Sequence, residues 1–218
     1  MLEARDITVR YGSRTVLDRV TLAVEPGSVL GLGGPSGCGK STLARVMAMM
    51  LRPRSGTVTV DGRTTPGWRQ RAPRDLRIRV ALVYQQPRLA VDPRLTLTEI
   101  VAEPLAAAGR PDPARVSSLA TEVGLTPDLL TRKPHEVSDG QLQRACVARA
   151  LTLSPRYLIC DEMTTMLDAS TQAHLVAVIN AYRAQTGAGI LAISHDTDLL
   201  TRWADHTSSL GAAQAGEA

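Results

Sequence analysis

The sequence predicts an α/β fold in which a block of helices interrupts a largely parallel β-sheet. Apolar runs of strand length alternate with helical patterns at both ends of the chain, whereas residues 95–153 show helical patterns only. The length of 218 residues suits one large domain with a core of its own. We expect a single domain over 1–218, with a core from 1–87 and 156–210, a helical subdomain over 88–155 and a disordered tail over 211–218.

The first part of the core is expected to begin with two antiparallel strands. Residues 2–10 and 16–24 alternate apolar and polar side chains around the turn sequence "YGSRT". A third strand, 28–34, ends in glycines and leads into a helix over 41–51. The run "TVTVDG" then indicates a short strand with an Asp-Gly turn, and 79–87 an apolar strand that Pro87 stops.

The middle of the chain shows helical patterns only, whereas strands and helices alternate towards its end. Helices are predicted from "LTEIVAEPLAAAG", "PARVSSLATEVG" and "SDGQLQRACVARALTL". Strands return at 156–162 and 189–194, and helices follow them at 170–186 and 196–204. A weak strand is expected near 206–210. Strands joined through helices favour a parallel sheet.

Composition excludes several classes of protein. No run of about 18 apolar residues occurs and the N-terminus lacks the zones of a signal peptide, so we expect a cytoplasmic chain that serves a membrane only peripherally. The three cysteines are odd in number and far apart, which argues against a disulfide framework. The net charge of +4 comes from dispersed arginines, and with no Phe, two Trp and four Tyr a nucleic-acid partner is not expected.

The stretch "GPSGCGKS" fits the phosphate-binding pattern G-x-x-x-x-G-K-[ST] and lies between a predicted strand and a predicted helix. Its glycines let backbone N–H groups converge on a phosphate, and the helix N-terminus adds positive charge. Lys40, one of only two lysines, would contact the β- and γ-phosphates, and the Ser41 hydroxyl would ligate Mg²⁺. The alternative is a chance glycine turn. The predicted loop residues are Gly34, Pro35, Ser36, Gly37, Cys38, Gly39, Lys40, Ser41 and Thr42.

Polar side chains at three other predicted strand ends suit the same chemistry. In "YLICDE", Asp161 would hold the metal through water, and Glu162 would orient or deprotonate the attacking water. His195 in "ISHD" and Gln85 after "VALVY" would lie at the same edge of the sheet. Surface capping for the acids, and purely structural roles for His195 and Gln85, are the alternatives.

The stretch "VSDGQLQR" predicts a second phosphate-binding element. Ser138, Gly140 and Gln141 lie at the start of a predicted helix, where side-chain and backbone donors suit an anion. The local phosphate loop already surrounds its own phosphates. This second half-site is therefore expected to serve another copy or a sister subunit.

From about Leu2 to Leu210 the chain resembles the ATP-binding subunit of ABC transporters. "VSDGQLQR" looks like that family's signature "LSGGQ-x-QR", and "GPSGCGKST", "LICDE", "MLD" at 166–168 and "ISHD" follow the family's order. The resemblance implies a P-loop NTPase of ABC type with a RecA-like core, N-terminal antiparallel strands and an inserted helical subdomain. It also implies ATP, Mg²⁺, a head-to-tail dimer of ATPases and transmembrane permease partners.

The same resemblance assigns roles to individual residues. It implies Tyr11 as the aromatic that stacks on adenine, Gln85 as a metal- and water-sensing glutamine and Asp168 as a dimer-interface residue. Glu162 is implied as the catalytic base and His195 as a switch. Tyr11 could instead cover the core, and Asp168 could cap the helix that follows it.

Within the family, "YQQPRLAVDPRLTLTEIVAEPL" resembles importers of the oligopeptide, dipeptide and nickel group. We expect an ATP-hydrolysing subunit at the cytoplasmic face of the membrane, with the permease docked between the helical insert and the core near 85–94. The short C-terminus slightly favours nickel or metal-chelate cargo over peptides. The alternatives are the ATPase of an exporter, or a soluble ABC-type ATPase of translation or DNA repair; "DPR" at 92–94 and the lack of tandem domains disfavour them.

Three positions depart from the family pattern or carry unusual chemistry. Asp139 stands where glycine is usual, and we expect its carboxylate to turn away from the nucleotide. Met163 replaces a common proline, which would leave the loop toward Asp168 less constrained. Cys38 lies in the phosphate loop at a helix N-terminus, where it is either a reactive thiol or simply a small residue that fits.

Overall fold

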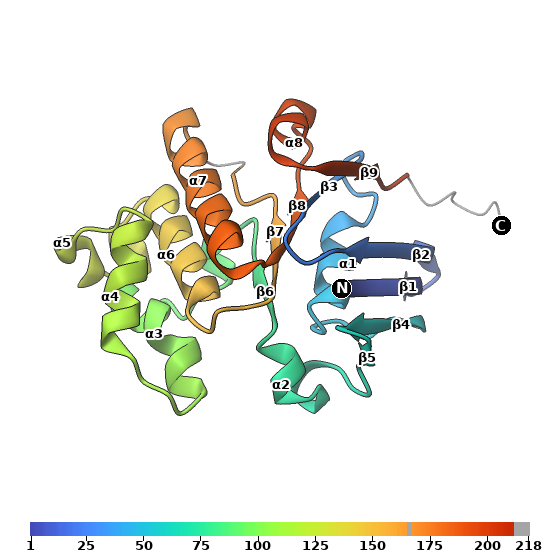
Figure 1. The fold of residues 1–218 in the computed structure, drawn as a ribbon, viewed down its shortest axis with the longest axis horizontal. Coiled ribbons are helices and arrows are strands. Elements are labelled where there is room, and N and C mark those ends of the chain that lie inside the picture. The colour runs from blue at the N-terminus through green and yellow to red at the C-terminus, as the bar shows by residue number, and fades with distance from the viewer. Residues whose placement is uncertain (165–166, 212–218) are drawn as a thin grey trace.

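The structure, a computed structural model, describes residues 1–164 and 167–211 (Figure 1). It contains an antiparallel sheet with strand order β2-β1-β4-β5 and a parallel sheet with order β6-β7-β8-β3-β9. The strands, in chain order, are β1 (Leu2–Tyr11), β2 (Arg14–Val24), β3 (Val29–Gly33), β4 (Ser55–Val60), β5 (Arg63–Thr64), β6 (Val80–Val83), β7 (Tyr157–Asp161), β8 (Gly189–Ile193) and β9 (His206–Ser209).

Helices cover the parallel sheet and fill the middle of the chain. Short 3₁₀ turns are η1 (Arg69–Arg71), η2 (Pro87–Leu89) and η3 (Pro134–Glu136). The α-helices are α1 (Lys40–Met47), α2 (Arg74–Arg77), α3 (Leu97–Ala107), α4 (Pro113–Glu122), α5 (Pro127–Leu130), α6 (Asp139–Leu151), α7 (Ala169–Thr186) and α8 (Thr197–Trp203). Within residues 1–164 and 167–211, none of the helices has the length and apolar character needed to cross a bilayer.

The order of strands in the parallel sheet follows from their side chains. All residues of β7 and β8 are buried, as expected for strands covered on both faces. In-register pairing sets Val83 beside Cys160 and Asp161 beside Ile193. The carboxyl ends of β6, β7 and β8 therefore meet at one edge of the sheet, which is where open α/β sheets bind ligands.

A hydrophobic cluster lies on each face of this sheet. One includes Ile7 of β1 and Leu43 of α1, and the other includes Ile100 of α3 and Leu175 of α7. Figure 1 shows the corresponding layers, with α6 and α7 on one side of the parallel strands and α1 with the antiparallel strands on the other. Because the helical block shares a core with the sheet, α6 has a defined position relative to the strand ends.

The largest differences from the predicted bounds lie in two elements. The strand expected over 79–87 ends at Val83, because the chain beyond it leaves the sheet to contact α6 and Glu162, the residue after β7. The helix expected over 41–51 runs over Lys40–Met47 and ends before Met49, whose φ of 59° breaks the helical path. The sequence did not predict β5, α2 or α5, which are two to four residues long. Beyond Gly211, the expected disordered tail lies outside the described residues.

Candidate nucleotide-binding site

The loop between β3 and α1 is held open by glycines. Gly34, Gly37 and Gly39 have φ values of 135°, 76° and 106°, a region that other residues rarely adopt. Gly39 is also the N-cap of α1, so the loop runs directly into the N-terminus of a helix. Such a loop presents backbone N–H groups and the positive end of the helix dipole to an anion.

Lys40 places its ammonium inside this loop. The side chain is 4% exposed, and its Nζ donates to the carbonyl oxygens of Gly34 at 2.8 Å and Pro35 at 3.0 Å. The same Nζ lies 3.8 Å from Oε1 of Glu162. A buried ammonium satisfied by loop carbonyls is positioned to contact phosphate oxygens that enter the loop.

Ser41 and Asp161 form an oxygen pair beside the loop. The Ser41 hydroxyl donates to Oδ1 of Asp161 at 3.0 Å, and Asp161 is 3% exposed. Burial raises the pKa of Asp161 above its usual value, and the hydrogen bond from Ser41 and the charge of Lys40 partly oppose the rise. A hydroxyl and a buried carboxylate at this distance fit a small hard cation such as Mg²⁺.

Three strand ends converge on the Glu162 carboxylate, which follows β7. Nε2 of Gln85, after β6, donates to Oε2 of Glu162 at 2.9 Å, and Nδ1 of His195, after β8, lies 3.5 Å from the same oxygen. Glu162 itself has a φ of 47°, an uncommon conformation for a non-glycine residue that is found more often at functional sites. The structure thus brings together Lys40, Gln85, Glu162 and His195, which are widely separated in the sequence.

The start of α6 is an N-capped helix terminus. The Ser138 hydroxyl accepts from the Gln141 N–H at 3.2 Å, and the Gln141 side chain accepts from the Ser138 N–H at 3.0 Å. A Cβ added to Gly140 would lie 3.4 Å from a methyl carbon of Leu167, so the start of α6 lies next to the loop before α7. Asp139, the first residue of α6, accepts a hydrogen bond from Nε of Arg88 at 2.6 Å. The sequence did not predict this role for Arg88.

The structure bears on the other residues that the sequence singled out. Tyr11, at the end of β1, is 51% exposed. Asp168 caps α7 by accepting from the Thr171 N–H at 2.9 Å, and hydrogen bonds from the Ser170 hydroxyl and the Thr171 N–H lower the pKa of this carboxyl. The capping alternative for Asp168 is therefore confirmed. Met166 of the "MLD" motif lies outside the described residues.

Met163 and Cys38 are both buried. Met163 is 3% exposed and belongs to the cluster beneath α6 and α7. Its side chain therefore packs in the core, whereas the sequence analysis noted only that it replaces a common proline. The loop that was expected to gain freedom includes residues 165–166, which the structure does not describe. Cys38 is 5% exposed, and a Cβ on Gly34 would lie 3.1 Å from its Sγ. The thiol therefore fills space under the loop.

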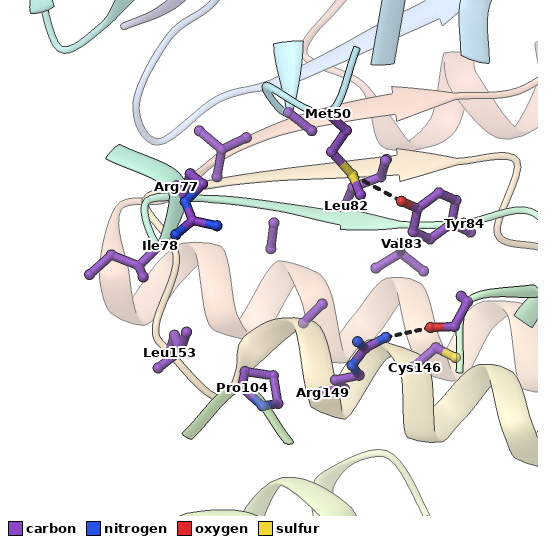
Figure 2. A pocket seen from close by; sticks show the side chains of 15 residues that line it. Met50, Arg77, Ile78, Leu82, Val83, Tyr84, Pro104, Cys146, Arg149 and Leu153 are labelled. Atoms are coloured by element: carbon purple, nitrogen blue, oxygen red, sulfur yellow. Dashed lines mark hydrogen bonds between the residues drawn. The ribbon is translucent and has the colours of Figure 1, made fainter. Parts of the chain in front are cut away.

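A cavity of about 220 Å³ lies between β6 and α6 (Figure 2). Val80 and Leu82 of β6, Met50 beyond α1, and Cys146 and Arg149 of α6 contribute to its lining. In Figure 2 the Tyr84 hydroxyl donates to Sδ of Met50 at 2.9 Å, and Arg149 donates to the Ala90 carbonyl at 2.7 Å. The sequence predicted a permease-docking groove between the helical insert and the core near 85–94, and Ala90 of that segment lines this cavity.

Comparison with known proteins identifies the family. The sequence model of the family described as "ABC transporter" matches residues 17–165. The chain belongs to this family. Its expected resemblance to the oligopeptide group is also confirmed, because it is 38% identical to the oligopeptide transport ATP-binding protein OppF of Salmonella typhimurium over 87% of the chain. It is 36% identical to the glutathione import ATP-binding protein GsiA of Pectobacterium atrosepticum over 93% of the chain.

A solved structure confirms the predicted fold class. A dimeric ATP-binding cassette in a post-hydrolysis state, bound to ADP and phosphate, superposes with a TM-score of 0.86 over 98% of this chain and 97% of that one. Its sequence identity of 24% supports the fold alone. The chain spans 58% of the length of OppF and 35% of the length of GsiA.

Proposed function

We propose that the chain is the ATP-binding and ATP-hydrolysing subunit that energises an ABC importer. The observation that carries the proposal is the convergence of Lys40, Gln85 and His195 on the Glu162 carboxylate beside a glycine-rich phosphate loop. No observation on the described residues favours export, translation or DNA repair.

Each residue of the site has its own role in ATP hydrolysis. The loop N–H groups and Lys40 bind the β- and γ-phosphates, and Tyr11 offers an exposed ring to adenine. Glu162 orients the attacking water and accepts its proton, a role that contributes about 10²–10⁴-fold in rate. His195 fixes the geometry at the γ-phosphate. Positioned charges and hydrogen-bond donors of this kind are the main way in which proteins promote phosphoryl transfer.

Mg²⁺ is the metal that the site suits. Ser41 and Gln85 would hold it through their hydroxyl and amide oxygens, and Asp161, which accepts a hydrogen bond from Ser41, would hold it through water. When bound, the metal neutralises charge that develops on the phosphate oxygens. Asp161 is buried, so a cation beside it would also favour its ionised form.

A second ATPase subunit would complete the site. Ser138, Gly140 and Gln141 form a capped helix N-terminus that suits phosphate, and the chain's own phosphate loop leaves it without a ligand of its own. The partner is a second copy or a sister subunit arranged head to tail. The dimeric state of the structurally similar cassette is consistent with this arrangement.

The permease partner would dock on the cavity between β6 and α6. Met50, which lines the cavity, is 44% exposed, and Leu89, next to the lining residue Ala90, is 83% exposed, so both offer apolar surface to a partner. Docking there would hold the chain at the cytoplasmic face of the membrane. The cargo would be peptides or nickel and metal chelates, and the names of the relatives favour peptides.

Light scattering on Glu162→Gln with and without ATP tests the proposal. The variant keeps the hydrogen bond with Gln85 but cannot accept a proton, so ATP should bind while hydrolysis falls by about 10²–10⁴-fold. Doubling of the mass with ATP would support an identical partner, and a monomer that binds ATP would point to a sister subunit. Lys40→Ala is the matched control that loses ATP binding. Unchanged hydrolysis by Glu162→Gln, or failure of the wild-type chain to bind ATP, contradicts the proposed function.

A further inference from the structure

Arg88 holds the loop that precedes α6 at three points. It lies on η2, three residues after Gln85, and its guanidinium donates to Oδ1 of Asp139 at 2.6 Å and to the carbonyl oxygens of Pro134 at 2.7 Å and Val137 at 3.0 Å. These acceptors lie on both sides of Ser138 in the sequence. The planar fork of an arginine is suited to fixing several oxygens at once.

A second contact joins the same two segments on the other side of Gln85. Gln143, one turn into α6, is 2% exposed, and its Nε2 donates to the Tyr84 carbonyl at 3.1 Å. Within residues 1–164 and 167–211 its Oε1 finds no hydrogen-bond partner. An unpaired buried oxygen is unfavourable, so the favourable contribution of this amide is its hydrogen bond to Tyr84. The residues before and after Gln85 are therefore both attached to the start of α6.

The charge of Asp139 gives Arg88 a further role. In the resemblance described above, glycine is usual at this position, so the acid adds a negative charge at a terminus suited to anions. Asp139 and Arg88 are each 46% exposed in their side chains, and exposed pairs add little to the stability of a fold. The pair matters instead through local charge and geometry, because an uncompensated carboxylate there repels a triphosphate.

We propose that Arg88 is a positioning residue for the half-site at Ser138: it neutralises Asp139 and ties the loop 134–139 to the Gln85 segment. This inference rests on the proposed function, since it assumes that the half-site receives the nucleotide of a partner subunit. Arg88 acts through Asp139 and the loop and does not itself touch the reacting atoms. Nucleotide contact at Ser138 is then linked to the Gln85–Glu162 hydrogen bond of the same chain.

Hydrogen exchange and steady-state kinetics on matched variants test the proposal. Arg88→Ala is compared with Arg88→Ala/Asp139→Asn, which also removes the carboxylate charge. The control is Arg63→Ala, which breaks another half-exposed arginine–aspartate pair, with Asp75, away from the site. In the nucleotide-free chain, Arg88→Ala should raise amide exchange in 134–142 and 84–90 by about tenfold or more. Arg63→Ala should leave both segments unchanged.

The kinetic measurement separates positioning from folding. Arg88→Ala should lower kcat about tenfold because of the exposed charge. KM for ATP should stay within about twofold because the nucleotide's own loop is intact. Adding Asp139→Asn should restore most of kcat, which a purely structural role for Arg88 would not allow. Wild-type exchange in Arg88→Ala, or no recovery in the double variant, overturns the inference. A wild-type chain that neither binds nor hydrolyses ATP would instead refute the proposed function, while the exchange data still decide whether Arg88 ties the loop.

Discussion

Gly34→Ala should destabilise the protein before any nucleotide is added. Gly34 has a φ of 135°, and a Cβ built on it would lie 2.4 Å from the carbonyl oxygen of Leu210, just after β9. That contact is too short for any real Cβ, and the obstacle is backbone rather than a side chain that can rotate away. The phosphate loop would have to move, or the end of β9 would have to leave its place beside β3.

The size of the effect follows from two terms. Holding alanine at such a φ costs about 1–3 kcal/mol. Relieving the overlap with the Leu210 oxygen costs about 1–3 kcal/mol more, as overpacking does. Gly37→Ala is the matched control, because Gly37 also has a positive φ, of 76°, but has no atom within 4 Å of an added Cβ. It should lose only about 1–2 kcal/mol, the cost of the left-handed conformation.

Urea unfolding of the nucleotide-free variants measures both losses, with stability read from the midpoint at constant slope. We expect Gly34→Ala to lose about 1–3 kcal/mol more than Gly37→Ala, because overpacking acts only at Gly34. Equal losses in the two variants would mean that the contact with Leu210 does not constrain the loop. ATP affinity measured on the same proteins then shows whether the distorted loop still binds phosphate.

Two further predictions concern titration and thiol chemistry. Burial would raise the pKa of Asp61, but hydrogen bonds from Tyr157 and Arg79 outweigh burial and lower the pKa. The ionised Asp61 carboxylate therefore stabilises the fold above the unfolded pKa, and this stabilisation is lost as the pH falls. Asp61→Asn should therefore lower the free energy of unfolding by about 1–2 kcal/mol at pH 7. Urea titrations should show this gap closing as the pH falls below about 4, the unfolded pKa of an aspartate, and a gap independent of pH would contradict the linkage. All three thiols are buried, so alkylation of the folded chain should be slow, and any inactivation of ATP hydrolysis that ATP prevents should come from Cys38, which lies in the phosphate loop. If Cys38→Ser is inactivated equally, Cys38 is not the reactive thiol.

The parts of the site that the sequence could predict depend on local chemistry or on topology. The glycines and Lys40 of the phosphate loop have a fixed spacing next to a strand and a helix. Glu162 and His195 each follow an apolar strand, and parallel strands bring their carboxyl ends to one edge. Their proximity therefore followed from the fold class, without knowledge of any side-chain conformation.

The parts that the sequence could not predict depend on contacts between distant residues. Nothing near Arg88 in the sequence indicates that its guanidinium meets Asp139, which is 51 residues away. The apolar run 79–87 predicted a long strand by periodicity, but hydrogen bonds from α6 and to Glu162 draw its second half out of the sheet. Tertiary contacts of this kind override local preference.

The segment from Tyr84 to Arg88 is placed to relay a change at the nucleotide to the proposed docking surface. Nε2 of Gln85 donates to Glu162, and the amide oxygen of the same side chain is the atom that would ligate the metal, so metal binding would act directly on this segment. The same segment is bonded to α6 through Arg88, and α6 forms one wall of the cavity beside β6. A transport cycle needs open and closed states that differ in their contacts with nucleotide. A shift of Gln85 that moves α6 would change the width of this cavity, and therefore the surface on which a permease would dock.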